Sequence, residues 1–130
     1  METRAWITRR LLFDWQQPEF LDEVRLDVER FVDKAVEVGA QSLDVVVKSA
    51  FGNCLYPSRV GRTNRAMKGD IFGRLCALAK ERGLEVFAYF NMLLDDALGA
   101  EHPEWLQRDP EGRSLKFESY AMCNYSARPQ

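Results

Sequence analysis

One plan occurs twice in this chain: Val-Glu-Val-Gly-Ala-Gln-Ser-Leu-Asp-Val-Val-Val at residues 36–47 and Ala-Lys-Glu-Arg-Gly-Leu-Glu-Val-Phe-Ala-Tyr-Phe at residues 79–90. Each stretch predicts the end of a helix, a capping glycine (Gly39 or Gly83), a short turn and a strand. The strand parts are almost continuously apolar, which is typical of parallel strands covered on both faces. The repeat therefore predicts an α/β protein of parallel (β/α) units, and both a barrel and an open doubly wound sheet are built in this way.

The flanking segments extend this plan. The apolar run over residues 5–13 predicts a first strand, and Pro18 predicts the start of a helix whose apolar spacing of three and four residues continues to Val36. A second helix is predicted from about Asp70 to Arg82. After the third strand the regularity fades. There the sequence predicts a short helix start at His102-Pro103-Glu104-Trp105 and a turn at Asp109-Pro110-Glu111-Gly112.

Composition limits the function. The chain has 130 residues, which suit one core but not two ordinary domains. Its 18 Lys and Arg residues against 20 Asp and Glu residues give a net charge of −2. This balance argues against a nucleic-acid binder or a membrane-surface protein. No stretch resembles a signal peptide or a transmembrane segment, so we expect a cytoplasmic protein.

The sequence predicts neither a metal nor a cofactor. Cys54, Cys76 and Cys123 are widely spaced, and His102 is the single histidine, so we expect free thiols rather than a zinc site. Phosphate-binding glycine motifs and nucleophile motifs are absent from the sequence. His102 precedes a proline at a predicted helix start, so a capping or surface role is expected for it.

In parallel α/β proteins, functional side chains lie just beyond the carboxyl ends of the strands. The predicted strand ends supply six candidates for substrate binding: Asp14 and Trp15, Lys48 and Tyr56, Asn91 and Asp95. Carboxylates and amides hydrogen-bond hydroxyls, and aromatic rings cover the apolar faces of pyranoses, so these residue types favour a sugar site. A structural alternative stays open, in which Asp14 and Lys48 form a partly buried ion pair and the two aromatic residues pack over the sheet.

Six segments carry a family resemblance: Val47–Ser58, Tyr56–Gly61, Val86–Phe90, His102–Trp105, Asp109–Gly112 and Cys123–Asn124. In this order and spacing they resemble the hypothetical glycosyl hydrolase 6 family, whose barrel proteins are similar to α-L-fucosidases of glycoside hydrolase family 29. The resemblance implies that residues 1–130 are an incomplete, N-terminal portion of a TIM (β/α)₈ barrel, which usually has about 250 residues.

The resemblance also carries a departure and a limit. In the family, the lysine that corresponds to Lys48 is commonly followed by a His-His pair that lines the sugar subsite in fucosidases. Ala50 and Phe51 stand there in this chain, so fucose specificity is not implied. The family's nucleophilic aspartate belongs to a fourth strand. We therefore expect it to lie beyond this chain, assign no catalytic residue, and expect residues 1–130 alone to be inactive.

Three functions are compatible with these observations. The first is one wall of the sugar cleft of a glycoside hydrolase barrel, with a carbohydrate substrate as the partner. The second is a non-catalytic sugar-binding or regulatory relative, which the loss of the histidine pair favours. The third is a complete small α/β domain, but such a domain needs about five parallel strands. Because three strands leave open edges, we expect a homo-oligomer or pairing with the missing C-terminal half of the barrel.

Overall fold

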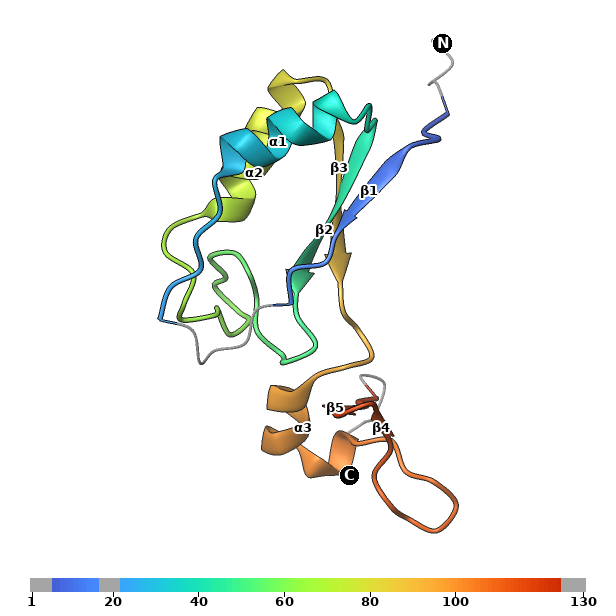
Figure 1. Cartoon of the computed structure of the whole chain (residues 1–130). Coiled ribbons are helices and arrows are strands. Elements are labelled where there is room, and N and C mark those ends of the chain that lie inside the picture. The colour runs from blue at the N-terminus through green and yellow to red at the C-terminus, as the bar shows by residue number, and fades with distance from the viewer. Residues whose placement is uncertain (1–5, 17–21, 125–130) are drawn as a thin grey trace.

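The computed structural model describes residues 6–16 and 22–124. In chain order its elements are β1 (Arg10–Phe13), α1 (Val28–Glu37), β2 (Ser42–Lys48), α2 (Ile71–Glu81), β3 (Glu85–Phe90), α3 (Asp96–Glu101), the 3-10 helix η1 (Pro103–Trp105), β4 (Lys116–Phe117) and β5 (Tyr120–Ala121). A sheet with two helices forms one part. Residues 92–124, which we call the small lobe, lie beyond the carboxyl ends of the strands (Figure 1).

The sheet is parallel and has the order β1-β2-β3. Leu43 at its centre is paired with Leu11 of β1 and with Val86 of β3. The register shifts between Val46 and Lys48, at the carboxyl end of β2. The predicted α/β class and the predicted parallel pairing are therefore confirmed.

α1 and α2 lie side by side on one face of the sheet (Figure 1). Each helix begins after an aspartate, Asp27 or Asp70, whose carboxylate accepts a hydrogen bond from the backbone N–H three residues later. Each is followed by a glycine in the left-handed region, Gly39 with φ 77° and Gly83 with φ 75°. A side chain at either position would be strained, which explains why the two predicted helix ends are correct.

The first helix is shorter than predicted. Pro18 lies outside the described residues, and α1 begins only at Val28. Before it, the N–H of Val24 donates to the carbonyl of Ala66 at 2.7 Å, and Val24 bridges to Met67. Pairing with the loop after β2 therefore holds this segment in an extended conformation, although its apolar spacing is that of a helix.

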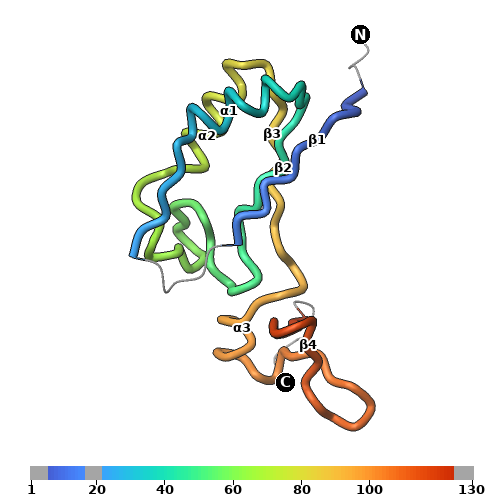
Figure 2. The backbone as a smooth tube through the Cα atoms, viewed as in Figure 1, coloured from blue at the N-terminus to red at the C-terminus, as the bar shows by residue number. Residues whose placement is uncertain are grey.

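The apolar core lies between the sheet and the two helices. Its fully buried members include Val28, Val32, Leu43, Val45 and Leu75. The other face of the sheet carries no helix among the described residues (Figure 2). On that face Leu12, Phe87 and Tyr89 are 56%, 38% and 49% exposed. We call these three residues the open face.

The small lobe contains α3, η1 and the β4–β5 hairpin. The predicted turn is confirmed, because the N–H of Gly112 donates to the carbonyl of Asp109 at 2.9 Å. The short helix start predicted at His102 corresponds to η1. Neither α3 nor the hairpin was predicted from the sequence. None of the described helices, in the lobe or beside the sheet, is long and apolar enough to cross a membrane.

Candidate functional site

A buried ion pair joins β2 to the small lobe. Lys48 Nζ lies 2.7 Å from Asp95 Oδ2, and the two side chains are only 8% and 5% exposed. Lys48 Nζ also donates to the backbone carbonyl of Asn91 at 3.1 Å and lies 5.5 Å from the ring centroid of Phe90. Lys48, Asn91 and Asp95, which the sequence places at two different strand ends, therefore come together.

Asp95 also organises the start of α3. Its Oδ1 accepts a hydrogen bond from the N–H of Leu98 at 2.8 Å, so it caps the helix. Gly52, in the loop after β2, packs directly against this carboxylate and has φ +91°. A Cβ at Gly52 would overlap Asp95 Oδ1 and come within 2.7 Å of Ala97 Cβ. Glycine is therefore required for the loop and the lobe to approach each other.

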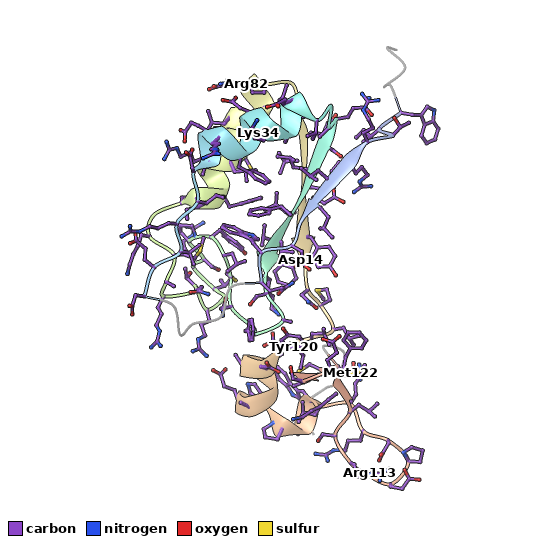
Figure 3. The ribbon with its side chains drawn as sticks, in the orientation of Figure 1. Asp14, Lys34, Arg82, Arg113, Tyr120 and Met122 are labelled. Carbon is purple, nitrogen blue, oxygen red and sulfur yellow. The ribbon has the colours of Figure 1, made fainter. Side chains whose placement is uncertain are left out.

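Ala50 and Phe51 attach the same loop to the lobe. Their carbonyls accept hydrogen bonds from the N–H groups of Asp96 and Ala97 at 3.1 and 3.2 Å. The Phe51 ring meets the ring of Tyr120 edge to face, with centroids 5.4 Å apart. Tyr120 lies where the lobe approaches the end of the sheet (Figure 3). The two apolar residues thus have a packing role in place of the imidazoles expected from the family.

A pocket of about 240 Å³ opens next to the ion pair. Its lining combines charged groups with an aromatic ring and includes Lys48, Gly52, Arg62, Phe90, Asp95 and Glu101. Arg62 belongs to the loop after β2 and Glu101 to the end of α3, so the pocket lies between the loop and the lobe. Convergent donors and acceptors beside a ring are suited to the hydroxyls and the C–H face of a sugar.

A buried network of polar side chains fixes the loop after β2. Asn53 Oδ1 accepts hydrogen bonds from Ser49 Oγ and from Asn64 Nδ2, both at 3.1 Å. All three side chains are fully buried. Buried polar groups that are paired in this way favour a single conformation. The network therefore gives a defined shape to the loop that carries Tyr56 and Arg62.

Tyr56 lies on the helix side of this loop rather than in the pocket lining. Its ring centroid is 6.5 Å from that of Phe72 in α2. Burial, and secondarily the neighbouring Cys54, raise the pKa of the Tyr56 phenol. The hydroxyl is therefore protonated at neutral pH and can donate a hydrogen bond.

Cys123 is a member of the site that sequence reasoning missed. Its buried Sγ donates to the backbone carbonyl of Asp95 at 3.3 Å. Burial, and then the Asp95 carboxylate, raise the pKa of the thiol, so it stays protonated. The segment Cys123-Asn124 carried only a family resemblance, with no chemical signal for this contact. Within the described residues, no three His, Cys, Asp or Glu side chains are grouped so that they could hold a metal.

The residues at the end of β1 have different surroundings. Trp15 is 5% exposed, and its indole N–H donates to the carbonyl of Val46 at 2.6 Å, so it packs over the sheet. Asp14 is exposed at the end of the strand (Figure 3). Because Lys48 pairs with Asp95, the alternative ion pair between Asp14 and Lys48 is wrong.

A parallel (β/α) sheet with a polar pocket at the carboxyl ends of its strands defines a class of proteins that bind or transform small molecules at that edge. Within this class, the chain belongs to the hypothetical glycosyl hydrolase 6 family, which it matches over residues 27–128. No curated protein sequence matches the chain.

Among the solved structures that are similar to it are two alpha-L-fucosidases. Alpha-L-fucosidase isoenzyme 2 from Paenibacillus thiaminolyticus is 22% identical with a TM-score of 0.83, and the match covers 91% of this chain and 19% of that chain. Alpha-L-fucosidase AlfC from Lactobacillus casei, in complex with its alpha-L-fucose product, is 28% identical with a TM-score of 0.52, covering 58% of this chain and 25% of that chain. This chain therefore spans a quarter or less of these relatives.

Proposed function

We propose that this chain supplies the N-terminal part of a glycoside hydrolase (β/α)₈ barrel and one wall of its sugar cleft. The observation that carries the proposal is the pocket beside Lys48 and Asp95, at the carboxyl ends of parallel strands, in a member of a glycosyl hydrolase family. In (β/α)₈ enzymes the active site lies at this edge. The fucosidase relatives are each longer than this chain, which supports a longer protein in which this chain forms one part of a barrel.

Within this wall the residues have two kinds of role. Asp14 is exposed and meets a sugar hydroxyl directly, while Lys48 and Asp95 contribute to the lining of the pocket. Both oxygens of Asp95 are engaged, by Lys48 and by the helix that Asp95 caps, so we assign it a binding role and not a catalytic one. The residues that support the wall from behind are Trp15, Tyr56 and Asn91.

The complete barrel would cleave a glycosidic bond with retention, through an oxocarbenium-like transition state. That chemistry needs two carboxyl groups about 5–5.5 Å apart. We place both in sequence outside residues 1–130. Because Ala50 and Phe51 pack against the lobe where imidazoles would bind the sugar, the proposal does not include fucose specificity.

A second candidate is a non-catalytic sugar-binding or regulatory relative of such a barrel. The surroundings of Ala50 and Phe51 favour this candidate. Neither side chain can hydrogen-bond a sugar, and both residues contact the small lobe instead. The cytoplasmic location and the absence of a nucleic-acid partner stay predictions from the sequence.

The two candidates are separated by turnover and binding assays on a panel of 4-nitrophenyl glycosides. We expect no turnover by residues 1–130, and turnover by a longer polypeptide that includes the following sequence. In that polypeptide Asp14→Asn should raise KM, whereas Asp22→Asn, another exposed aspartate that does not follow a strand, should not. Binding without turnover in the longer protein would favour the second candidate. Turnover by residues 1–130 alone would contradict the first, and no binding at all would contradict both.

A further inference from the structure

A second hollow, of about 440 Å³, lies on the small lobe. It is lined by Glu104, Trp105, Leu106, Gln107, Arg108, Leu115 and Asn124, and we call it the Trp105 groove. It shares no lining residue with the pocket beside the ion pair. The two hollows nevertheless adjoin the same short segment of chain. Glu101 lines the pocket beside the ion pair, and Glu104 lines the Trp105 groove. Their Cα atoms are separated by at most about 11 Å, the reach of three peptide units.

Trp105 is held as a fixed platform in this groove. The His102 ring stacks on the indole with centroids 3.9 Å apart and an interplanar angle of 9°. His102 Nδ1 is itself 3.0 Å from Glu104 Oε1, which fixes the imidazole. One face of the indole is thus covered, and a ligand in the groove meets the part of the ring that His102 leaves open. The indole N–H is buried without a hydrogen-bond partner among the described residues.

Polar groups of defined position surround this ring. The Arg108 guanidinium donates to the carbonyls of Gly112 at 2.8 Å and Pro103 at 3.4 Å, so it is held in place. Gln107 Nε2 donates to the carbonyl of Cys123, which leaves its Oε1 as an acceptor. The exposed Glu104 carboxylate adds a second acceptor. Its pKa is lowered by the hydrogen bond to its own backbone N–H and by His102, so it is ionised at neutral pH.

We propose that the Trp105 groove is a second saccharide-binding site, which holds one neutral sugar unit of a glycan whose other end occupies the pocket beside Lys48 and Asp95. The C–H face of the pyranose lies on the indole, and Gln107, Arg108 and Glu104 bind its hydroxyls. The groove carries both signs of charge, which favours a neutral unit over an acidic one. This inference rests on the proposed sugar cleft and makes an oligosaccharide, rather than a single sugar, the substrate class.

The test uses glycan binding by the whole chain. A fluorescently labelled chain on an array of immobilised neutral mono- and oligosaccharides identifies the best binder, which is then titrated by calorimetry beside its terminal monosaccharide. Trp105→Ala should weaken oligosaccharide binding about tenfold, the upper end of what ring stacking contributes, and leave monosaccharide binding unchanged. Trp105→Phe should retain most of the affinity, because it keeps an aromatic ring, although a smaller one, and the N–H that it loses has no partner among the described residues.

Trp6→Ala is the matched control. Trp6 is 89% exposed, precedes β1 in the chain and lines neither hollow, so its loss should change neither affinity. Undiminished oligosaccharide binding by Trp105→Ala would overturn the inference and leave the proposed cleft intact. An equal loss of both sugars together with a lower melting temperature would show a structural role and also overturn it. If the unsubstituted chain bound no glycan, the proposed function would fail as well.

Discussion

Lys48 is the residue whose replacement most directly tests the buried ion pair. Lys48→Met leaves the Asp95 carboxylate buried without the cation that now lies 2.7 Å away. Removing one partner of a buried pair costs about 3–5 kcal/mol, because the other charge stays desolvated. We expect a loss of that size in the free energy of unfolding from urea titrations. The control, Arg113→Met, removes an exposed cation that pairs with Asp109 and Glu111, and it should cost much less. If Lys48→Met and Arg113→Met lowered the free energy of unfolding equally, the Lys48–Asp95 pair would not be a buried ion pair.

Gly52 gives a second test at the residue scale. Gly52→Ala places a methyl group against Asp95 Oδ1 and Ala97 Cβ, in addition to the strain of φ +91°. Gly69→Ala is the matched control, because Gly69 has φ +74° and nothing within 4 Å of a built Cβ. The control should cost about 1 kcal/mol of backbone strain alone. Gly52→Ala should cost clearly more in the same urea titration. If the two costs are equal, the loop relaxes away from Asp95.

At the scale of elements, the sequence predicted best where apolar runs and glycines mark the elements. β2 and β3 follow from continuous apolarity, and the ends of α1 and α2 follow from Gly39 and Gly83, whose positive φ no other residue adopts cheaply. The helical spacing before Val28 misled the prediction because tertiary pairing with the loop after β2 holds that segment extended.

The candidate site was predictable only in part. Strand ends brought Lys48, Asn91 and Asp95 to one edge, as parallel topology requires. The contacts among these three residues depend on the position of α3. This helix has 6 residues, which is too short to show an apolar period, and its position depends on the Asp95 cap and on the loop after β2. The contact of Cys123 with Asp95 depends on the return of the chain through the hairpin, which no local pattern encodes.

The attachment of the small lobe can be tested through Tyr120. Its ring contact with Phe51 links β5 to the loop after β2, beside the hydrogen bonds from the start of α3. Tyr120→Ala should raise hydrogen exchange in residues 92–124 and leave the amides of α1 and α2 protected, because local openings follow structural units. Phe117→Ala removes a ring that is 57% exposed in the same hairpin and should have little effect. Exchange that rises equally throughout the chain would contradict a separate lobe.

At the scale of the whole molecule, stability should depend on alkaline pH. Burial raises the pKa values of Tyr56, Cys76 and Cys123. Each group therefore binds its proton more tightly in the folded state, and stability is lost as pH rises from the ordinary pKa, 9.0 for the two thiols and 10.0 for the phenol, through the raised values. Urea titrations from about pH 8 to pH 10 should show the free energy of unfolding falling. Replacing Cys76 and Cys123 together by serine should flatten this fall, and an unchanged slope would contradict burial of these thiols as its cause.

The open face makes the last prediction. Leu12, Phe87 and Tyr89 are exposed on one side of a parallel sheet, a kind of sheet that is normally covered on both faces. We predict that residues 1–130 self-associate through this face, so that the weight-average mass in sedimentation experiments rises with concentration. Tyr89→Lys should suppress the rise, because a charge buried in the contact would be unpaired.

Val60→Lys is the matched control for this prediction, since Val60 is 100% exposed but lies in the loop after β2 and not in the sheet. If Val60→Lys suppresses association as strongly as Tyr89→Lys, the contact lies at the loop. A monomer at every concentration would contradict the prediction. In a longer polypeptide the proposed barrel would cover Leu12, Phe87 and Tyr89 with its own strands. Tyr89→Lys should then destabilise the fold instead of changing its mass, which ties the association of the short chain to the architecture of the long one.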